Sequence, residues 1–100
     1  MIVVVSQDGV DLEEPDDCGA FKLVGRDVGP DEVQGAVSGI GIYGGDCAWI
    51  EPEVVRTLAE SRVGDDWDDR FDAMVTYAVS KSWVDEEGRI RAHIEWEGAE

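Results

Sequence analysis

Residues 89–96 read Arg-Ile-Arg-Ala-His-Ile-Glu-Trp and alternate between polar and apolar side chains at every step. The apolar members are Ile90, Ala92, Ile94 and Trp96. A period of two is typical of a half-buried antiparallel strand, whose successive side chains point to opposite faces of a sheet. Trp83-Val84 and the turn-forming run Asp-Glu-Glu-Gly come just before it, so the sequence predicts a C-terminal antiparallel β-hairpin.

The segment upstream of this hairpin has the spacing of an amphipathic helix. Apolar side chains recur at i, i+4, i+7, i+8 and i+11, namely Trp67, Phe71, Met74, Val75 and Ala78. We expect Asp65 or Asp66 to accept hydrogen bonds from the first free amides of the helix. Lys81 falls near the negative end of the helix dipole, where a cation is favourable.

The rest of the chain predicts shorter elements. Strands are expected over residues 1–6, 21–26 and 48–50, because these runs are apolar and bounded by turn-forming residues. A weak helix is expected from Asp31, because Gly35 and Gly39 each cost it about 1 kcal/mol relative to Ala. A second helix is expected over about 52–62, with Gly64 at its C-terminal cap. Residues 8–17, which are rich in acids, and residues 39–45, which are rich in glycine, are expected to be loops.

These elements predict one small α+β domain over residues 1–100, with about three helices and the C-terminal hairpin. The order of the last five elements resembles that of a winged-helix domain, so we expect a winged-helix-like C-terminal part; this is a likeness of order alone. The alternative is an α+β arrangement in which the strands at 1–6 and 90–96 join one sheet.

The charge of the chain is strongly negative. Its 100 residues include 24 acidic and 8 basic side chains, a net charge of −16. Such a surface repels phosphate backbones and anionic membranes, which argues against nucleic-acid or membrane binding. The two halves carry −8 each, since residues 1–50 have 10 acids and 2 bases and residues 51–100 have 14 and 6. The acidity therefore belongs to the whole surface, and either a basic partner or a saline cytoplasm would account for it.

The sequence gives no sign of export or of membrane insertion. The apolar run at residues 1–5 is short and has no basic residues before it, and no stretch approaches the length of a membrane span. Cys18 and Cys47 lie far apart without CxxC spacing, so free thiols in a reducing cytoplasm are expected.

Motifs that carry chemistry are weak. Gly39, Gly41 and Gly44 match a GxGxxG pattern, but a weak helix precedes them and a short strand follows, opposite to the order of a dinucleotide-binding turn. His93 is the only histidine, so a histidine-rich metal site is excluded, and a Cys–His pair would need a closeness that the sequence does not give. We therefore expect no cofactor and no metal, and favour a protein that is not an enzyme.

The function that the composition favours is a small acidic protein-interaction module of the inhibitor, immunity, antitoxin or regulatory type, with a basic protein as its partner. Acids of the long helix and the residues around the hairpin are its candidate partner-binding side chains: Asp65, Asp66, Asp68, Asp69, Asp72, Trp83, Arg89, Arg91 and His93. Two alternatives stay open. One is a small enzyme or ligand-binding domain with a pocket near Gly39–Gly45 and His93; the other is an accessory subunit of a larger complex. Homo-oligomerisation is compatible with each.

Overall fold

A six-stranded mixed sheet forms the centre of the molecule. The computed structural model describes residues 1–60 and 62–98, and in them the strands follow the order β2-β1-β3-β6-β5-β4. Their bounds are β1 (Ile2–Ser6), β2 (Gly9–Glu13), β3 (Lys22–Arg26), β4 (Gly41–Tyr43), β5 (Cys47–Ile50) and β6 (Ile90–Glu97). β1, β3 and β6 run parallel, while β2 and β5 pair antiparallel with β1 and β6. The C-terminal strand thus lies inside the sheet.

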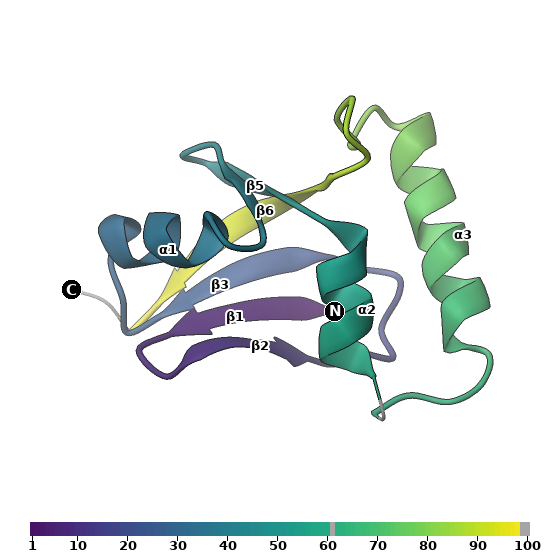
Figure 1. Cartoon of the computed structure of the whole chain (residues 1–100), viewed down its shortest axis with the longest axis horizontal. Coiled ribbons are helices and arrows are strands. Elements are labelled where there is room, and N and C mark those ends of the chain that lie inside the picture. The colour runs from purple at the N-terminus through teal and green to yellow at the C-terminus, as the bar shows by residue number, and fades with distance from the viewer. Residues whose placement is uncertain (61, 99–100) are drawn as a thin grey trace.

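Three helices cover parts of this sheet in the described residues: α1 (Pro30–Val37), α2 (Pro52–Ala59) and α3 (Trp67–Ser80). α1 and α2 lie across one face, and α3 stands beyond the edge where β1, β3 and β6 begin (Figure 1). The core between sheet and helices is apolar and includes Val3, Leu12, Leu23, Ile50 and Phe71. No helix among the described residues has the length and apolar character needed to cross a membrane.

The winged-helix-like arrangement is wrong. The predicted hairpin forms only as a short pairing, made of the bridge between Val84 and Ile90 and of two backbone hydrogen bonds, from the Arg91 amide to the Trp83 carbonyl and from the Asp85 amide to the Arg89 carbonyl. β6 instead pairs along its length with β3, in the register Lys22 opposite His93, and with β5. The hairpin alone offered β6 a two-residue partner, whereas the apolar strands β3 and β5 satisfy its backbone on both sides. The structure therefore is strand-rich, although it has the three helices that were expected. Strands 1–6 and 90–96 do share one sheet, with β3 between them.

Two strands lie where loops were expected. β2 falls in the acidic stretch 8–17, and its Val10 and Leu12 alternate with Asp11 and Glu13. This period of two was the signal for a strand, and the charge of the segment hid it. β4 falls in the glycine-rich stretch 39–45 and pairs antiparallel with β5, so this segment is a β-hairpin.

The helices agree with the expected positions but not with all their expected ends. α2 ends at Ala59, with Glu60 at its C-terminal cap, so Gly64 is not the cap. The expected helix over 52–62 also included Ser61, which lies outside the described residues. Asp66 occupies the N-cap position of α3 without a side-chain cap hydrogen bond, because its carboxylate faces Arg70 at 3.4 Å.

The N-terminal half of α3 is fixed by aromatic packing. Trp67 and Phe71 are buried and stack with ring centroids 4.9 Å apart. The Trp67 indole N–H donates to the carbonyl of Pro15 at 2.6 Å, and the Arg56 guanidinium lies 4.9 Å above the Phe71 ring. α3 therefore has a defined position beside the strand ends, although few of its backbone atoms approach the sheet.

Candidate functional site

A groove separates α3 from the ends of the strands at which β3 and β6 begin. Its larger part has a volume of about 520 Å³ and lies between α3, the segment before β3 and the start of β6. Its lining is mostly small and apolar: Cys18, Gly19, Ala20, Phe21, Arg70, Ala73, Met74, Tyr77, Ala78, Trp83, Ile90 and Arg91. A smaller hollow of about 270 Å³ is lined by Phe21, Trp83, Arg91 and His93. The two hollows share three residues, so they form one continuous surface, called here the aromatic groove.

The C-terminal end of α3 places Trp83 at this groove. Ser82 adopts a left-handed conformation with φ 63°. The Ser82 amide donates to the Val79 carbonyl at 3.1 Å, and the Trp83 amide donates to the Ala78 carbonyl at 2.8 Å. This pair of bonds is the Schellman motif, in which the residue after the left-handed one packs against the last turn of the helix. The helix end thus directs the Trp83 indole toward Tyr77.

Tyr77 and Trp83 form an exposed aromatic pair. Their ring centroids lie 5.9 Å apart at a steep angle, and their exposed fractions are 56% and 41%. The Lys81 ammonium lies 5.5 Å from the Tyr77 ring centroid. Large aromatic side chains concentrate binding energy at protein interfaces, so an exposed pair beside a hollow is a strong candidate site.

Arg91 joins this pair from β6. Its amide donates to the Trp83 carbonyl at 2.8 Å, which fixes the two residues side by side. Among the described residues, Arg91 and Lys81 have no carboxylate within 4.0 Å. The other six cationic side chains each form an ion pair: Lys22, Arg26, Arg56, Arg62, Arg70 and Arg89. The two free cations of the described chain therefore both flank the aromatic pair.

His93 also lines the groove, and its register partner in β5, Cys47, accepts a backbone hydrogen bond from Gly44 of the glycine-rich segment at 2.8 Å. It lies opposite Cys47 in the β5–β6 register, so the two side chains share a sheet face. No hydrogen bond joins them among the described residues. Gly41 is opposite Ile50, and a Cβ at Gly41 would collide with the Trp49 carbonyl. The glycine there permits close strand pairing, and no helix begins at this turn to hold a phosphate.

Both cysteines are free thiols. Cys18 is half-buried in the groove wall, and burial raises the pKa of its thiol. A thiol with a raised pKa is less often the reactive thiolate, so Cys18 acts here as a small apolar wall residue.

Arg89 lies apart from the groove, in the turn before β6. Its guanidinium contacts the Asp85 carboxylate at 3.2 Å, and its amide donates to the same carboxylate at 2.8 Å. Partial burial alone would raise the pKa of Asp85, but hydrogen bonds from Arg89 and from the Glu87 amide outweigh it and lower the pKa. Arg89 therefore holds the turn, with its Nε buried and without a hydrogen-bond partner among the described residues.

The acids of the α3 region divide into paired and free groups. Asp68 and Asp72 both contact Arg56, whose pKa is raised chiefly by the hydrogen bond to Asp72. Asp66 contacts Arg70. Asp65 and Asp69 are exposed and have no ion pair among the described residues. Part of the expected acidic face is thus neutralised within the molecule.

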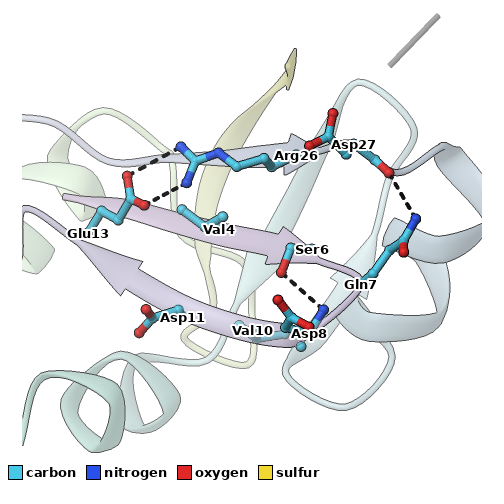
Figure 2. Close-up of a pocket in the computed structure, with 10 residues that line it drawn as sticks. Val4, Ser6, Gln7, Asp8, Val10, Asp11, Glu13, Arg26 and Asp27 are labelled. Atoms are coloured by element: carbon cyan, nitrogen blue, oxygen red, sulfur yellow. Dashed lines mark hydrogen bonds and ion pairs between the residues drawn. The ribbon is translucent and has the colours of Figure 1, made fainter. Parts of the chain in front are cut away.

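Outside the aromatic groove, another hollow of about 690 Å³ lies where β1 and β3 end and β2 begins (Figure 2). Its single cation, Arg26, contacts Glu13 at 2.6 Å and Glu97 at 3.0 Å. Hydrogen bonding to Arg26 lowers the pKa of Glu13, and the same bond raises the pKa of Arg26. Figure 2 shows Val4 beside this pair, and Val4 is buried even though it faces away from the core. The ion pairs here cover the sheet and leave the arginine engaged.

No group of three or more metal-ligating side chains gathers within residues 1–60 and 62–98. Comparison with protein-family models, with curated proteins and with solved structures finds no match for this chain.

The structure brings together three of the residues expected from sequence, Trp83, Arg91 and His93, and places Arg89 and the acids elsewhere. Sequence reasoning missed the remaining wall of the groove, notably Phe21 and Tyr77. For Tyr77 a signal existed. Ala73 and Tyr77 extend the apolar stripe of α3 beyond the face that packs in the core. The stripe is therefore wider than a single buried helix face requires.

Proposed function

We propose that this chain is a small protein-interaction module of the inhibitor, immunity, antitoxin or regulatory type that binds a basic protein partner. The observation that carries the proposal is the exposed Tyr77–Trp83 pair at the edge of the aromatic groove. Burying two such rings against a partner would supply the hot spot that a small interface needs.

The charge of the surface supports a basic partner. A net charge of −16 accelerates encounter with a positively charged protein and slows encounter with an acidic one. A hollow of about 610 Å³ between α2 and α3 adds a local contribution. Glu53, Glu60, Asp65 and Asp68 line it, and its one cation, Arg56, is already paired with carboxylates. A lysine or arginine of a partner would find uncompensated carboxylates there.

Site-specific photo-crosslinking in the native host tests the proposal. A photoreactive phenylalanine analogue replaces Tyr77, and in a matched control it replaces Ile42, which is also exposed and apolar but lies on β4. We expect position 77 to yield a discrete product with a basic protein, and position 42 to lack that product. The association rate of the purified pair should fall as salt rises. Equal products from both positions, or none from position 77, would refute the proposal.

A second candidate function is that of an accessory subunit in a larger complex. It is favoured by Ile42, which is 49% exposed on an edge strand. An exposed apolar residue on a strand edge suits sheet extension by another chain. A discrete product from position 42 alone in the same experiment would favour this candidate.

A further inference from the structure

We infer that the aromatic groove takes a short peptide segment of the partner in which an aromatic or large aliphatic side chain stands next to an aspartate or glutamate. This inference rests on the proposed function and names the chemistry that the groove selects. The apolar side chain would fill the hollow beside Phe21 and Trp83, and the carboxylate would pair with Arg91.

The composition of the lining is the first support. The chain has three acids for every base, 24 against 8, yet none of the described residues that line the two hollows is acidic. Four of them, Arg70, Trp83, Arg91 and His93, have side-chain nitrogens that can donate to a carboxylate. The groove is thus a local inversion of the charge of the whole surface.

The state of the cations is the second support. Arg70 is occupied by Asp16 and Asp66, whereas Arg91 has no carboxylate within reach among the described residues. An arginine presents donors in a planar fork that matches a carboxylate. Lys81, also without an ion pair in the described part of the chain, lies near Tyr77 and adds to the positive potential. An acidic side chain of the partner is therefore the ligand that complements the groove.

The shape of the surface indicates a segment that passes through. The hollows of about 520 and 270 Å³ continue into one another across Phe21, Trp83 and Arg91. This length exceeds one side chain and suits a short peptide whose anchor and carboxylate, on neighbouring residues, both face the groove. A partner that is basic overall would meet the acidic surface at long range and be held in register by this one reversed charge.

Matched peptides test the inference. The probes are Gly-Phe-Asp-Gly, Gly-Phe-Asn-Gly and Gly-Ala-Asp-Gly, each acetylated and amidated so that the only carboxylate is on the side chain. Binding is followed in two-dimensional NMR through the backbone amide signals of Trp83 and Arg91 and the indole N–H signal of Trp83. We expect the Phe-Asp peptide to bind about tenfold more tightly than the Phe-Asn peptide, and the Ala-Asp peptide to bind more weakly than either.

Two variants complete the design. Arg91→Gln should remove the difference between the Phe-Asp and Phe-Asn peptides and leave the affinity for Phe-Asn unchanged. Arg26→Gln, on the same sheet face, should leave the difference intact. Both variants are first compared with the parent chain in urea unfolding, and only folded protein is titrated.

The outcomes separate the inference from the function. Equal affinity for the Phe-Asp and Phe-Asn peptides would overturn the carboxylate inference, while saturable binding of both at Trp83 would leave the docking groove standing. Absence of binding by all three peptides, together with a crosslink from position 77, would overturn the inference and retain the proposed module. Retention of the preference in Arg91→Gln would also overturn it.

Discussion

Arg26 and Arg91 lie on the same face of the sheet, on the adjacent strands β3 and β6, and differ in what surrounds them. Arg26 is clamped between Glu13 of β2 and Glu97 of β6. Arg91 has no carboxylate partner among the described residues and stands beside the aromatic pair. In so acidic a chain, a paired arginine is the ordinary case. The comparison teaches that the first arginine serves the fold, while the second is available to a ligand.

The largest effect is expected from removing the support of the groove. Phe71→Ala deletes a fully buried ring that stacks on Trp67 and lies beneath Arg56. The free energy of unfolding should fall by about 3–5 kcal/mol, measured by urea denaturation. The signals of Trp83 should shift with it, because α3 loses its anchor, while the Arg26 region should keep its own. A loss below about 1 kcal/mol would contradict this account of α3.

The two arginines themselves should give opposite results. Arg91→Gln should weaken binding of the Phe-Asp peptide about tenfold and leave the unfolding midpoint unchanged. Arg26→Gln should lower the unfolding midpoint, since it removes ion pairs that cover Val4, and leave peptide binding unchanged. Calorimetric titration and urea unfolding of both variants measure these effects. If both variants changed peptide affinity and the unfolding midpoint in the same way, the two arginines would not have different roles.

A smaller effect is expected at the helix end that directs Trp83. Ser82 holds a left-handed conformation, φ 63°, which glycine adopts without steric cost. Ser82→Gly should therefore stabilise the protein by about 0.5–1 kcal/mol and leave peptide binding unchanged. Thermal unfolding checks the first part. Destabilisation would show that the serine side chain, rather than the backbone turn, holds Trp83 in place.

The smallest effect on stability is expected at Asp85, the carboxylate that pairs with Arg89, and it depends on pH. The folded-state pKa of Asp85 is lowered, so its carboxylate contributes stability above its ordinary value of 3.8 and loses it as pH falls through the folded pKa. Asp85→Asn should thus be less stable than the parent at pH 7, and the difference should shrink as pH falls below 3.8 and be lost once the carboxyl of the folded protein is protonated. Urea midpoints at several pH values measure it. A difference that persists at low pH would assign the role to shape rather than charge.

The local elements were within reach of the sequence, and the pairing of strands was not. The alternation over residues 89–96 predicts a strand, and Trp67, Phe71 and Ala78 predict a helix face; both are confirmed. The same alternation suits a hairpin or a central strand equally, so the winged-helix-like arrangement could not be excluded from it. β2 was missed because the charges of Asp11 and Glu13 hid the alternation of Val10 and Leu12.

The site shows the same division. Trp83, Arg91 and His93 could be singled out in the sequence because they interrupt an acidic chain with an aromatic ring or a basic side chain. Phe21 and Tyr77 come from segments more than fifty residues apart, and nothing local indicates that they share a groove. Arg89 and Arg91 are two residues apart, yet only the turn geometry shows that Asp85 pairs with Arg89, while Arg91 has no carboxylate within 4.0 Å in residues 1–60 and 62–98.

By itself, the sequence determined the acidity of the surface, the amphipathic helix, the period-two strand and the closeness of Trp83 to Arg91 along the chain. These properties follow from composition and from the local periods of helix and strand. Only the tertiary structure decided that β6 lies between β3 and β5, that α3 lies beside the ends of the strands, and that six basic residues of the described chain form ion pairs there while Arg91 forms none with any described residue. Those outcomes depend on which distant segments come into contact, and a local sequence pattern does not specify this.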